Sequence, residues 1–285
     1  MDIAIGLPST VPGASGKQLT EWARRAEAAG FSSLGTIDRI VYANIEPLTA
    51  LSAAAAVTDR IKLATSILIA PYRLNTALLA KQAASIQRIS GGRLVLGLAV
   101  GARENDYEAS GADFHERGKL FDRQLASMRE IWSESSDAGT TIGPEVAANP
   151  PEILIGGTVD AAFRRAAEHG SGWILGGGTP EQFADGREKL EAAWSKAGRE
   201  GSPKAAGLAY WALGDNADAD ASAYLTNYYA YLGDVADAIA ESAAKDADTV
   251  RARVKGFADA GCDELFLMPS SSDPAQVDLL AEAAL

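Results

Sequence analysis

The chain alternates short apolar runs with amphipathic segments, and this alternation constrains its fold more than any other feature. Eight of the runs are strand-like, and we expect strands at residues 3–8, 33–37, 61–69, 93–100, 153–155, 173–175, 205–213 and 263–268. The spacing of apolar residues predicts helices at residues 18–29, 47–58, 76–89, 114–132, 159–169, 181–198, 217–245, 249–260 and 274–285. Residues 133–151 are polar and rich in Gly and Pro, and should form an irregular connection.

Strands that alternate with helices predict a parallel sheet with the helices outside it. Eight such strands match a closed (β/α)8 TIM barrel, a fold of about 250 residues. We therefore predict one α/β barrel domain over residues 1–285. An open doubly wound sheet is the alternative.

Composition narrows the choice of partners and compartment. The 285 residues carry a net charge of −12, which argues against nucleic acid and anionic membrane surfaces as partners. No secretory signal or membrane-spanning stretch is visible, so we expect a cytoplasmic protein. The single cysteine, Cys262, cannot form an internal disulfide and fits a reducing compartment, where it should be an inert core residue.

Two glycine-rich turns follow the fifth and sixth expected strands. They are formed by Gly156, Gly157 and Thr158, and by Gly176, Gly177, Gly178 and Thr179. Because parallel strands joined by a crossover helix end on the same side of the sheet, both turns should lie at one end of it. Glycine amides and a helix N-terminus can hold a phosphate there. The alternative, that the glycines only make tight turns, fits these residues equally well.

The expected strand ends, where barrel active sites lie, are poor in common catalytic groups. The chain has two histidines, both at helix ends, which argues against a histidine triad and against a histidine-ligated metal site. Asp38 and Glu104 could be the paired carboxylates of a hydrolase, but each lies beside an arginine, and a structural ion pair is the preferred interpretation. Few acids and bases beside many glycine turns suggest that a cofactor carries the chemistry.

Long segments of the chain resemble the bacterial luciferase-like flavin-dependent oxidoreductases, and the resemblance covers nearly the whole sequence. The segments are GKQLTEWARRAEAAGFSSLGTIDRI, RIKLATSILIAPYRLNTALLAKQAASIQRISGGRLVLGLAVGARENDYEASG, FHERGKLFDRQL and PEILIGGTVDAAFRRAAEHGSGWILGGGTPEQF. The resemblance implies a (β/α)8 barrel that binds FMN or the deazaflavin coenzyme F-420 at its C-terminal face. Members either add oxygen to a substrate with reduced FMN or transfer hydride with the deazaflavin.

The resemblance also implies roles for single residues. It assigns the cofactor phosphate to the two glycine turns. Ser66 and Ile67 match the position that lines the isoalloxazine ring, where several relatives have a non-prolyl cis peptide. Gly101 and Arg103 match positions beside the cofactor.

One position departs from the family pattern. Many relatives carry histidine after the second-strand aspartate, Asp38, and here Arg39 takes its place. A guanidinium cannot exchange protons near neutral pH as an imidazole can, so Arg39 could instead hold an anionic flavin or an acidic substrate. A general acid must then come from elsewhere, and the candidates are Glu104, Tyr107 and Tyr210.

Aromatic residues near the strand ends are candidates for a substrate pocket. Aromatic walls suit flat ligands, so we place in the pocket Tyr107, Tyr210 and Trp211. A further trio shares one helical face and is compatible with core packing, a pocket wall or a subunit contact: Tyr224, Tyr228 and Tyr231.

The sequence therefore predicts a flavin-dependent oxidoreductase of the luciferase-like monooxygenase type, which uses reduced FMN and oxygen on a small organic substrate. A separate reductase could supply the reduced cofactor, and a homodimer is the commonest kind of assembly. The alternatives are an F-420-dependent hydride-transfer enzyme on the same fold and a non-catalytic flavin-binding protein.

Overall fold

The computed structural model describes residues 1–133 and 142–285. Each strand pairs in parallel with its neighbours in sequence, and the first strand pairs with the last, so the sheet is a closed barrel. The predicted barrel is confirmed, and the open doubly wound alternative is wrong. The strands are β1 (Asp2–Gly6), β2 (Ser33–Thr36), β3 (Lys62–Ile69), β4 (Leu94–Ala99), β5 (Glu152–Gly156), β6 (Gly172–Leu175), β7 (Lys204–Trp211) and β8 (Glu264–Pro269).

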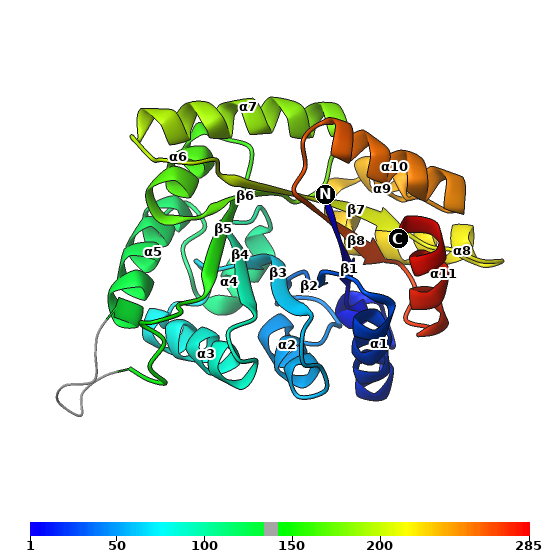
Figure 1. Cartoon of the computed structure of the whole chain (residues 1–285), viewed down its shortest axis with the longest axis horizontal. Coiled ribbons are helices and arrows are strands. Elements are labelled where there is room, and N and C mark those ends of the chain that lie inside the picture. The colour runs from blue at the N-terminus through cyan, green and yellow to red at the C-terminus, as the bar shows by residue number, and fades with distance from the viewer. Residues whose placement is uncertain (134–141) are drawn as a thin grey trace.

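Most of the helices lie around the outside of the strands (Figure 1). Their ends follow local signals in the sequence. For example, Ser15 caps the first helix in a reciprocal pair of hydrogen bonds with Gln18, and Gly30 ends it with a φ of 96°. These helices are α1 (Gly16–Ala29), α2 (Pro47–Ala55), α3 (Thr76–Ile89), α5 (Arg117–Ser133), α6 (Asp160–His169), α7 (Pro180–Lys196), α10 (Ala247–Asp259) and α11 (Ala275–Ala284).

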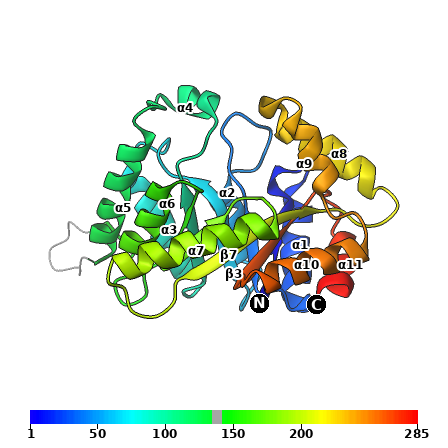
Figure 2. The same ribbon diagram turned by 90° about the horizontal axis from the view of Figure 1, so that it is seen from above.

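The other helical elements lie at the C-terminal ends of the strands. They are η1 (Pro8–Thr10), α4 (Glu104–Ser110), α8 (Ala217–Tyr228), η2 (Ala230–Leu232) and α9 (Val235–Ser242). Figure 2 shows α4 on one side and α8 with α9 on the other, at the end of the molecule opposite both termini. Because β1 starts at the N-terminus, that end is where the strands finish.

Some expected boundaries need correction. The helix α4 was not expected, because residues 104–110 carry no apolar repeat, and α5 begins at Arg117 rather than at residue 114. The expected helix over residues 217–245 is broken into α8, η2 and α9, with Gly233 at a φ of 58° between the last two. Residues 142–151 contain no helix or strand, as expected, and the rest of that connection, 134–141, lies outside the described residues.

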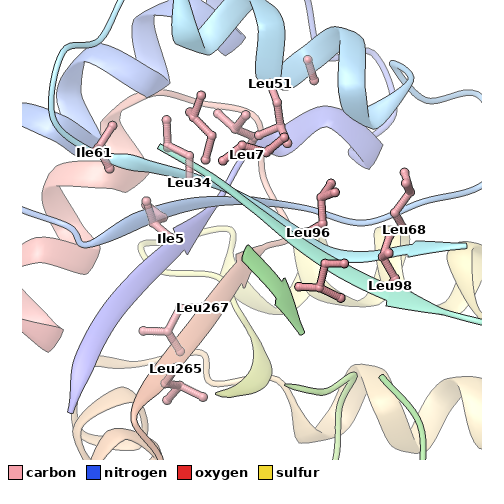
Figure 3. Close-up of a cluster of buried hydrophobic side chains, with 14 of the residues drawn as sticks. Ile5, Leu7, Leu34, Leu51, Ile61, Leu68, Leu96, Leu98, Leu265 and Leu267 are labelled. Atoms are coloured by element: carbon pink, nitrogen blue, oxygen red, sulfur yellow. The ribbon is translucent and has the colours of Figure 1, made fainter. Parts of the chain in front are cut away.

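Side chains of the strands point alternately outward and inward. On β8, Leu265 and Leu267 pack outward in a cluster with residues of surrounding helices such as α1 and α2, whereas Phe266 and Met268 belong to a second cluster, with inward-facing strand residues and residues of α8. Figure 3 shows outward-packing leucines of several strands together with Leu51 of α2. The strands are thus buried on both faces, which explains why they read as continuous apolar runs.

The strand β3 is irregular near its C-terminal end. The peptide bond between Ser66 and Ile67 is cis, which is the geometry noted above for several relatives at this position. The register of β3 against β4 shifts between Thr65 and Leu68. Ile67 packs against the interior cluster but is only partly buried, so it faces the open end of the barrel.

Gly172, at the start of β6, provides a test of the strand packing. A Cβ placed on Gly172 would overlap the backbone carbonyl of Lys204 on the paired strand β7. We expect Gly172→Ala to lower the free energy of unfolding by about 1–3 kcal/mol in urea denaturation, because backbone atoms must move to admit the methyl group. Gly16→Ala is the control, since open space surrounds Gly16 and the change should not destabilise. Equal stability of Gly172→Ala and the wild type would contradict this packing.

Candidate active site

A cavity of about 540 Å³ opens at the C-terminal ends of the strands. Residues at the ends of β2 through β7 and in the α8–η2 segment line it. Both glycine turns border the same space, through Gly156, Gly157, Thr158, Gly176 and Gly177. The prediction that the two turns meet at one end of the barrel is confirmed.

The first glycine turn leaves backbone amides free for a ligand. Val159 occupies the N-cap of α6 and makes no side-chain cap, so the amides of Asp160 and Ala161 stay available, whereas the Ala162 amide donates to the Val159 carbonyl. Gly157 has a φ of 127°, a conformation that favours glycine, and Thr158 beside it is exposed. Together these groups offer a phosphate several donors at the positive end of a helix.

The second glycine turn contributes fewer residues to the cavity lining than the sequence predicts. Thr179 caps α7: its hydroxyl accepts a hydrogen bond from the Gln182 amide, and its own amide donates to the Gln182 side chain. Gly178 lies against the same glutamine, because a Cβ there would come within 2.6 Å of Gln182 Oε1. Neither residue lines the cavity. The placement of Gly178 and Thr179 in the phosphate cradle is therefore corrected, since the cap of α7 uses them.

Ile67 fills the space between the two turns. A Cβ on Gly156 would overlap Ile67 Cδ1, and a Cβ on Gly176 would lie 3.2 Å from the same atom. Glycine at both positions thus leaves room for Ile67 to reach the cavity. The other residues that the resemblance places beside the cofactor also line the cavity: Ser66, Gly101 and Arg103.

Asp38 lines the cavity but is held in a buried ion pair. Its carboxylate is 1% exposed, accepts from Arg73 Nη1 at 2.7 Å and accepts from the Ile69 amide at 2.9 Å. Burial raises the pKa of Asp38, and the Arg73 guanidinium opposes that shift. The preferred structural interpretation of Asp38 holds, although its partner is Arg73 rather than the neighbouring arginine.

Arg39 is bound in a second buried ion pair. Its Nε lies 3.0 Å from Asp106 Oδ2, with the two side chains 7% and 3% exposed. The guanidinium also donates to the carbonyls of Val41 and Tyr228. Arg39 does not line the cavity, so the expectation that it would hold an anionic flavin or substrate is wrong. Glu104 is also misplaced as a catalytic residue, because it is exposed at the start of α4 and lies outside the cavity lining.

Tyrosines form much of the cavity lining. One set comes from β7 and the α8–η2 segment, and we call it the tyrosine wall: Tyr210, Tyr228, Tyr229 and Tyr231. The hydroxyls of Tyr210 and Tyr229 lie 2.7 Å apart. A second set comes from elsewhere, with the Tyr72 and Tyr107 rings edge to face at 5.7 Å. Burial raises the pKa values of Tyr107, Tyr210 and Tyr228, so these hydroxyls stay protonated at neutral pH.

The structure excludes Trp211 from the pocket and divides the three tyrosines that were expected to share one helical face. Trp211 is fully buried outside the cavity, where its ring packs 6.4 Å from that of Trp22 and its indole donates to the Leu267 carbonyl. It points to the helices because the adjacent Tyr210 points into the barrel, so its placement in the pocket is wrong.

Tyr224 is buried, and its hydroxyl is hydrogen-bonded to the Thr10 hydroxyl at 2.6 Å, whereas Tyr228 and Tyr231 line the cavity.

Sequence reasoning missed two charged residues of the cavity lining, Asp106 and Arg117. Asp106 pairs with a residue 67 positions away, so no local spacing reveals it. Arg117 begins α5, where its guanidinium lies 3.8 Å from the Phe114 ring centre. Within residues 1–133 and 142–285, we find no cluster of three possible metal ligands and no helix long and apolar enough to cross a membrane.

The model of the luciferase-like monooxygenase family matches residues 2–277. The chain belongs to this family. The match spans both glycine turns, the cis peptide and the tyrosine wall, so the family predicted from sequence is confirmed.

Two curated relatives of this luciferase-like chain match part of it. An uncharacterised protein of Mycobacterium tuberculosis is 34% identical over 191 residues, which are 56% of this chain and 66% of the relative. The F420-dependent glucose-6-phosphate dehydrogenase of Amycolatopsis mediterranei is 30% identical over 182 residues, 57% of this chain and 54% of the relative. The chain thus spans less than two thirds of the length of these relatives.

A solved structure shows the same fold over the whole chain. The crystal structure of the monooxygenase RslO1 from Streptomyces bottropensis has a TM-score of 0.79 and 24% sequence identity. The comparison covers 99% of this luciferase-like chain and 98% of RslO1.

The tyrosines predict how stability depends on pH. Burial raises the pKa of seven of the eight, namely Tyr42, Tyr72, Tyr107, Tyr210, Tyr224, Tyr228 and Tyr229. Above about pH 10 the unfolded chain loses tyrosine protons that the native state retains, so the free energy of unfolding should fall as pH rises. In an absorbance titration, the native protein should form tyrosinate at higher pH than the chain in denaturant. Coincident titration curves would contradict the burial of these hydroxyls.

Proposed function

We propose that this luciferase-like protein is a monooxygenase that uses reduced FMN and oxygen on a small organic substrate. The observation that carries the proposal is the convergence of both glycine turns, Ile67 and the tyrosine wall on one cavity. The turns suit a phosphate, and a cavity with apolar and aromatic walls suits a flat ring. Family membership supports the same assignment.

The cofactor would be held mainly by the first glycine turn. The amides of Asp160 and Ala161 at the start of α6 and the amide of Gly157 would bind its phosphate, with Gly177 bordering the same space. Ile67 and Ser66 would contact the ring from β3. When bound there, reduced FMN supplies the electrons with which oxygen is activated.

The ionisable groups of the cavity favour a reaction in which the protein donates protons. Among the described residues that line it, none is a histidine or lysine, and both carboxylates, Asp38 and Asp106, are bound to arginines. The remaining ionisable groups are protonated tyrosine hydroxyls and the guanidinium groups of Arg103 and Arg117. Oxidation of an alcohol needs a base for the hydroxyl proton, whereas oxygen insertion needs a donor for the oxygen atom that leaves as water. Tyr210 is the proposed donor, because the Tyr107 hydroxyl already donates to the Val100 carbonyl.

A second candidate is a reductase that transfers hydride from reduced F-420 to its substrate. The similarity to the F420-dependent glucose-6-phosphate dehydrogenase favours this cofactor. The same cavity would serve, because reduction of a double bond also consumes a proton from a donor. Only the first candidate, the FMN-dependent monooxygenase, would need a separate reductase to supply reduced FMN.

The two candidates differ in which cofactor binds and in what reoxidises it. We would titrate the purified protein with FMN and with F-420 by calorimetry and absorbance. Binding of FMN, followed by oxygen uptake that depends on an added substrate, is the result the monooxygenase proposal predicts. Tight binding of F-420 alone would reject it in favour of the reductase, and binding of neither would reject both.

Thr158→Asp tests the phosphate site. Thr158 is exposed, so the fold should survive, but a carboxylate next to a phosphate should weaken cofactor binding by at least about 100-fold. The control is Thr20→Asp, which adds the same charge on α1, outside the cavity lining, and should leave affinity unchanged. Wild-type affinity in Thr158→Asp would exclude this turn as the phosphate site.

A further inference from the structure

The charges of the cavity lining that have no ion-pair partner are positive, in a protein whose net charge is −12. Two of its charged residues, Asp38 and Asp106, are neutralised by arginines that do not line it, Arg73 and Arg39. The two arginines that do line it, Arg103 and Arg117, form no ion pair with any carboxylate in the part of the chain that the structure describes. Such a lining attracts an anion.

Arg103 is held in place by aromatic rings rather than by charge. Its guanidinium carbon lies 4.3 Å from the Tyr228 ring centre and 4.5 Å from that of Tyr231. One nitrogen, Nη2, donates to the Tyr228 carbonyl at 3.3 Å. The Nε atom is buried and has no hydrogen-bond partner. Arg103 is half-buried at the cavity, and an anionic group of a ligand would stabilise its guanidinium, which has an unused donor and no carboxylate partner.

The surroundings of Arg103 restrict the rest of the ligand. Tyr229 lies within 5.5 Å of the same guanidinium, measured to its ring centre, and bonds to Tyr210 through the hydroxyls. These rings offer flat faces and edges, against which an aromatic ligand packs well. The cationic group and the aromatic surface are therefore adjacent in one wall.

We propose that the substrate is a planar aromatic molecule with an acidic group, a carboxylate or a phenolate, which Arg103 binds while the ring packs against the tyrosine wall. The inference rests on the proposed function for calling this ligand the substrate. Arg103 is then a specificity-determining residue, separate from the glycine turns that take the cofactor phosphate.

Arg117 is the other arginine of the lining, and it lies in a different environment. Its guanidinium lies against Phe114 and donates to the Phe114 carbonyl, and the Phe114 ring packs 5.3 Å from that of Tyr107. The guanidinium of Arg103 lies over rings of the tyrosine wall, whereas that of Arg117 lies over Phe114. An acid whose ring packs on that wall should therefore depend on Arg103 and not on Arg117.

The test compares two probes with the same ring system, 1-hydroxy-2-naphthoate and its methyl ester, in which a methyl group replaces the negative charge of the carboxylate. Their affinities would be measured by calorimetry for the wild type and for Arg103→Gln, Arg103→Lys and Arg117→Gln. Arg199→Gln is the matched control, since Arg199 lies 4.1 Å from the Trp194 ring centre and is outside the cavity lining. Every titration is run with and without FMN or F-420, and circular dichroism checks each fold.

We expect the wild type to bind the acid at least about tenfold more tightly than the ester. Arg103→Gln should reduce that preference to about twofold or less, Arg103→Lys should retain part of it, and the other two variants should keep it. Equal wild-type affinity for acid and ester overturns the inference, as does a preference lost in Arg117→Gln but kept in Arg103→Gln. An Arg103→Gln variant that loses cofactor affinity and keeps the acid preference also overturns it.

The titrations with FMN and F-420 distinguish a failure of this inference from a failure of the proposed function. A protein that binds neither FMN nor F-420 but prefers the acid through Arg103 would reject the proposed function and support the site. A protein that binds cofactor normally and shows no acid preference would reject the inference alone.

Discussion

The parallel pairing of β1 with β8 is the constraint on which the rest of the structure depends. It closes the barrel, so all eight strands finish at one end and the segments that follow them surround one space. The glycine turns after β5 and β6 reach that space together with Ile67 of β3 and Tyr210 of β7. Because the α8–η2 segment follows β7 at the same end, its tyrosines complete the wall.

Two buried ion pairs then determine the chemistry that this space can support. Asp38 with Arg73 and Asp106 with Arg39 neutralise the carboxylates that would otherwise act as bases. Each pair also connects segments distant in sequence, and removing one partner would leave an uncompensated buried charge. What remains in the lining is donors: protonated tyrosines, backbone amides and two arginines. A cavity of this kind suits anionic ligands and a reaction that takes up protons.

The repeating pattern of the sequence was sufficient to predict the barrel, and the glycine turns were sufficient to predict where its site lies. Two wrong assignments, Trp211 to the pocket and Thr179 to the phosphate cradle, conflict with patterns that are visible in the sequence. Tyr210 and Trp211 are adjacent on one strand and cannot both face inward, and Thr179 with Gln182 has the spacing of a helix cap. The pairing of Arg39 with Asp106 could not be predicted, because it depends on how the loop after β2 meets α4 once the barrel has closed.

The central claim is that backbone amides at the first glycine turn bind the phosphate of a redox cofactor. A crystal structure of the protein with FMN or F-420 tests it most directly. The account predicts phosphate oxygens within hydrogen-bond distance of the amides of Gly157 and the first turn of α6, with the ring between Ile67 and the tyrosine wall. A phosphate bound elsewhere, with the first turn contacting only solvent, would contradict it.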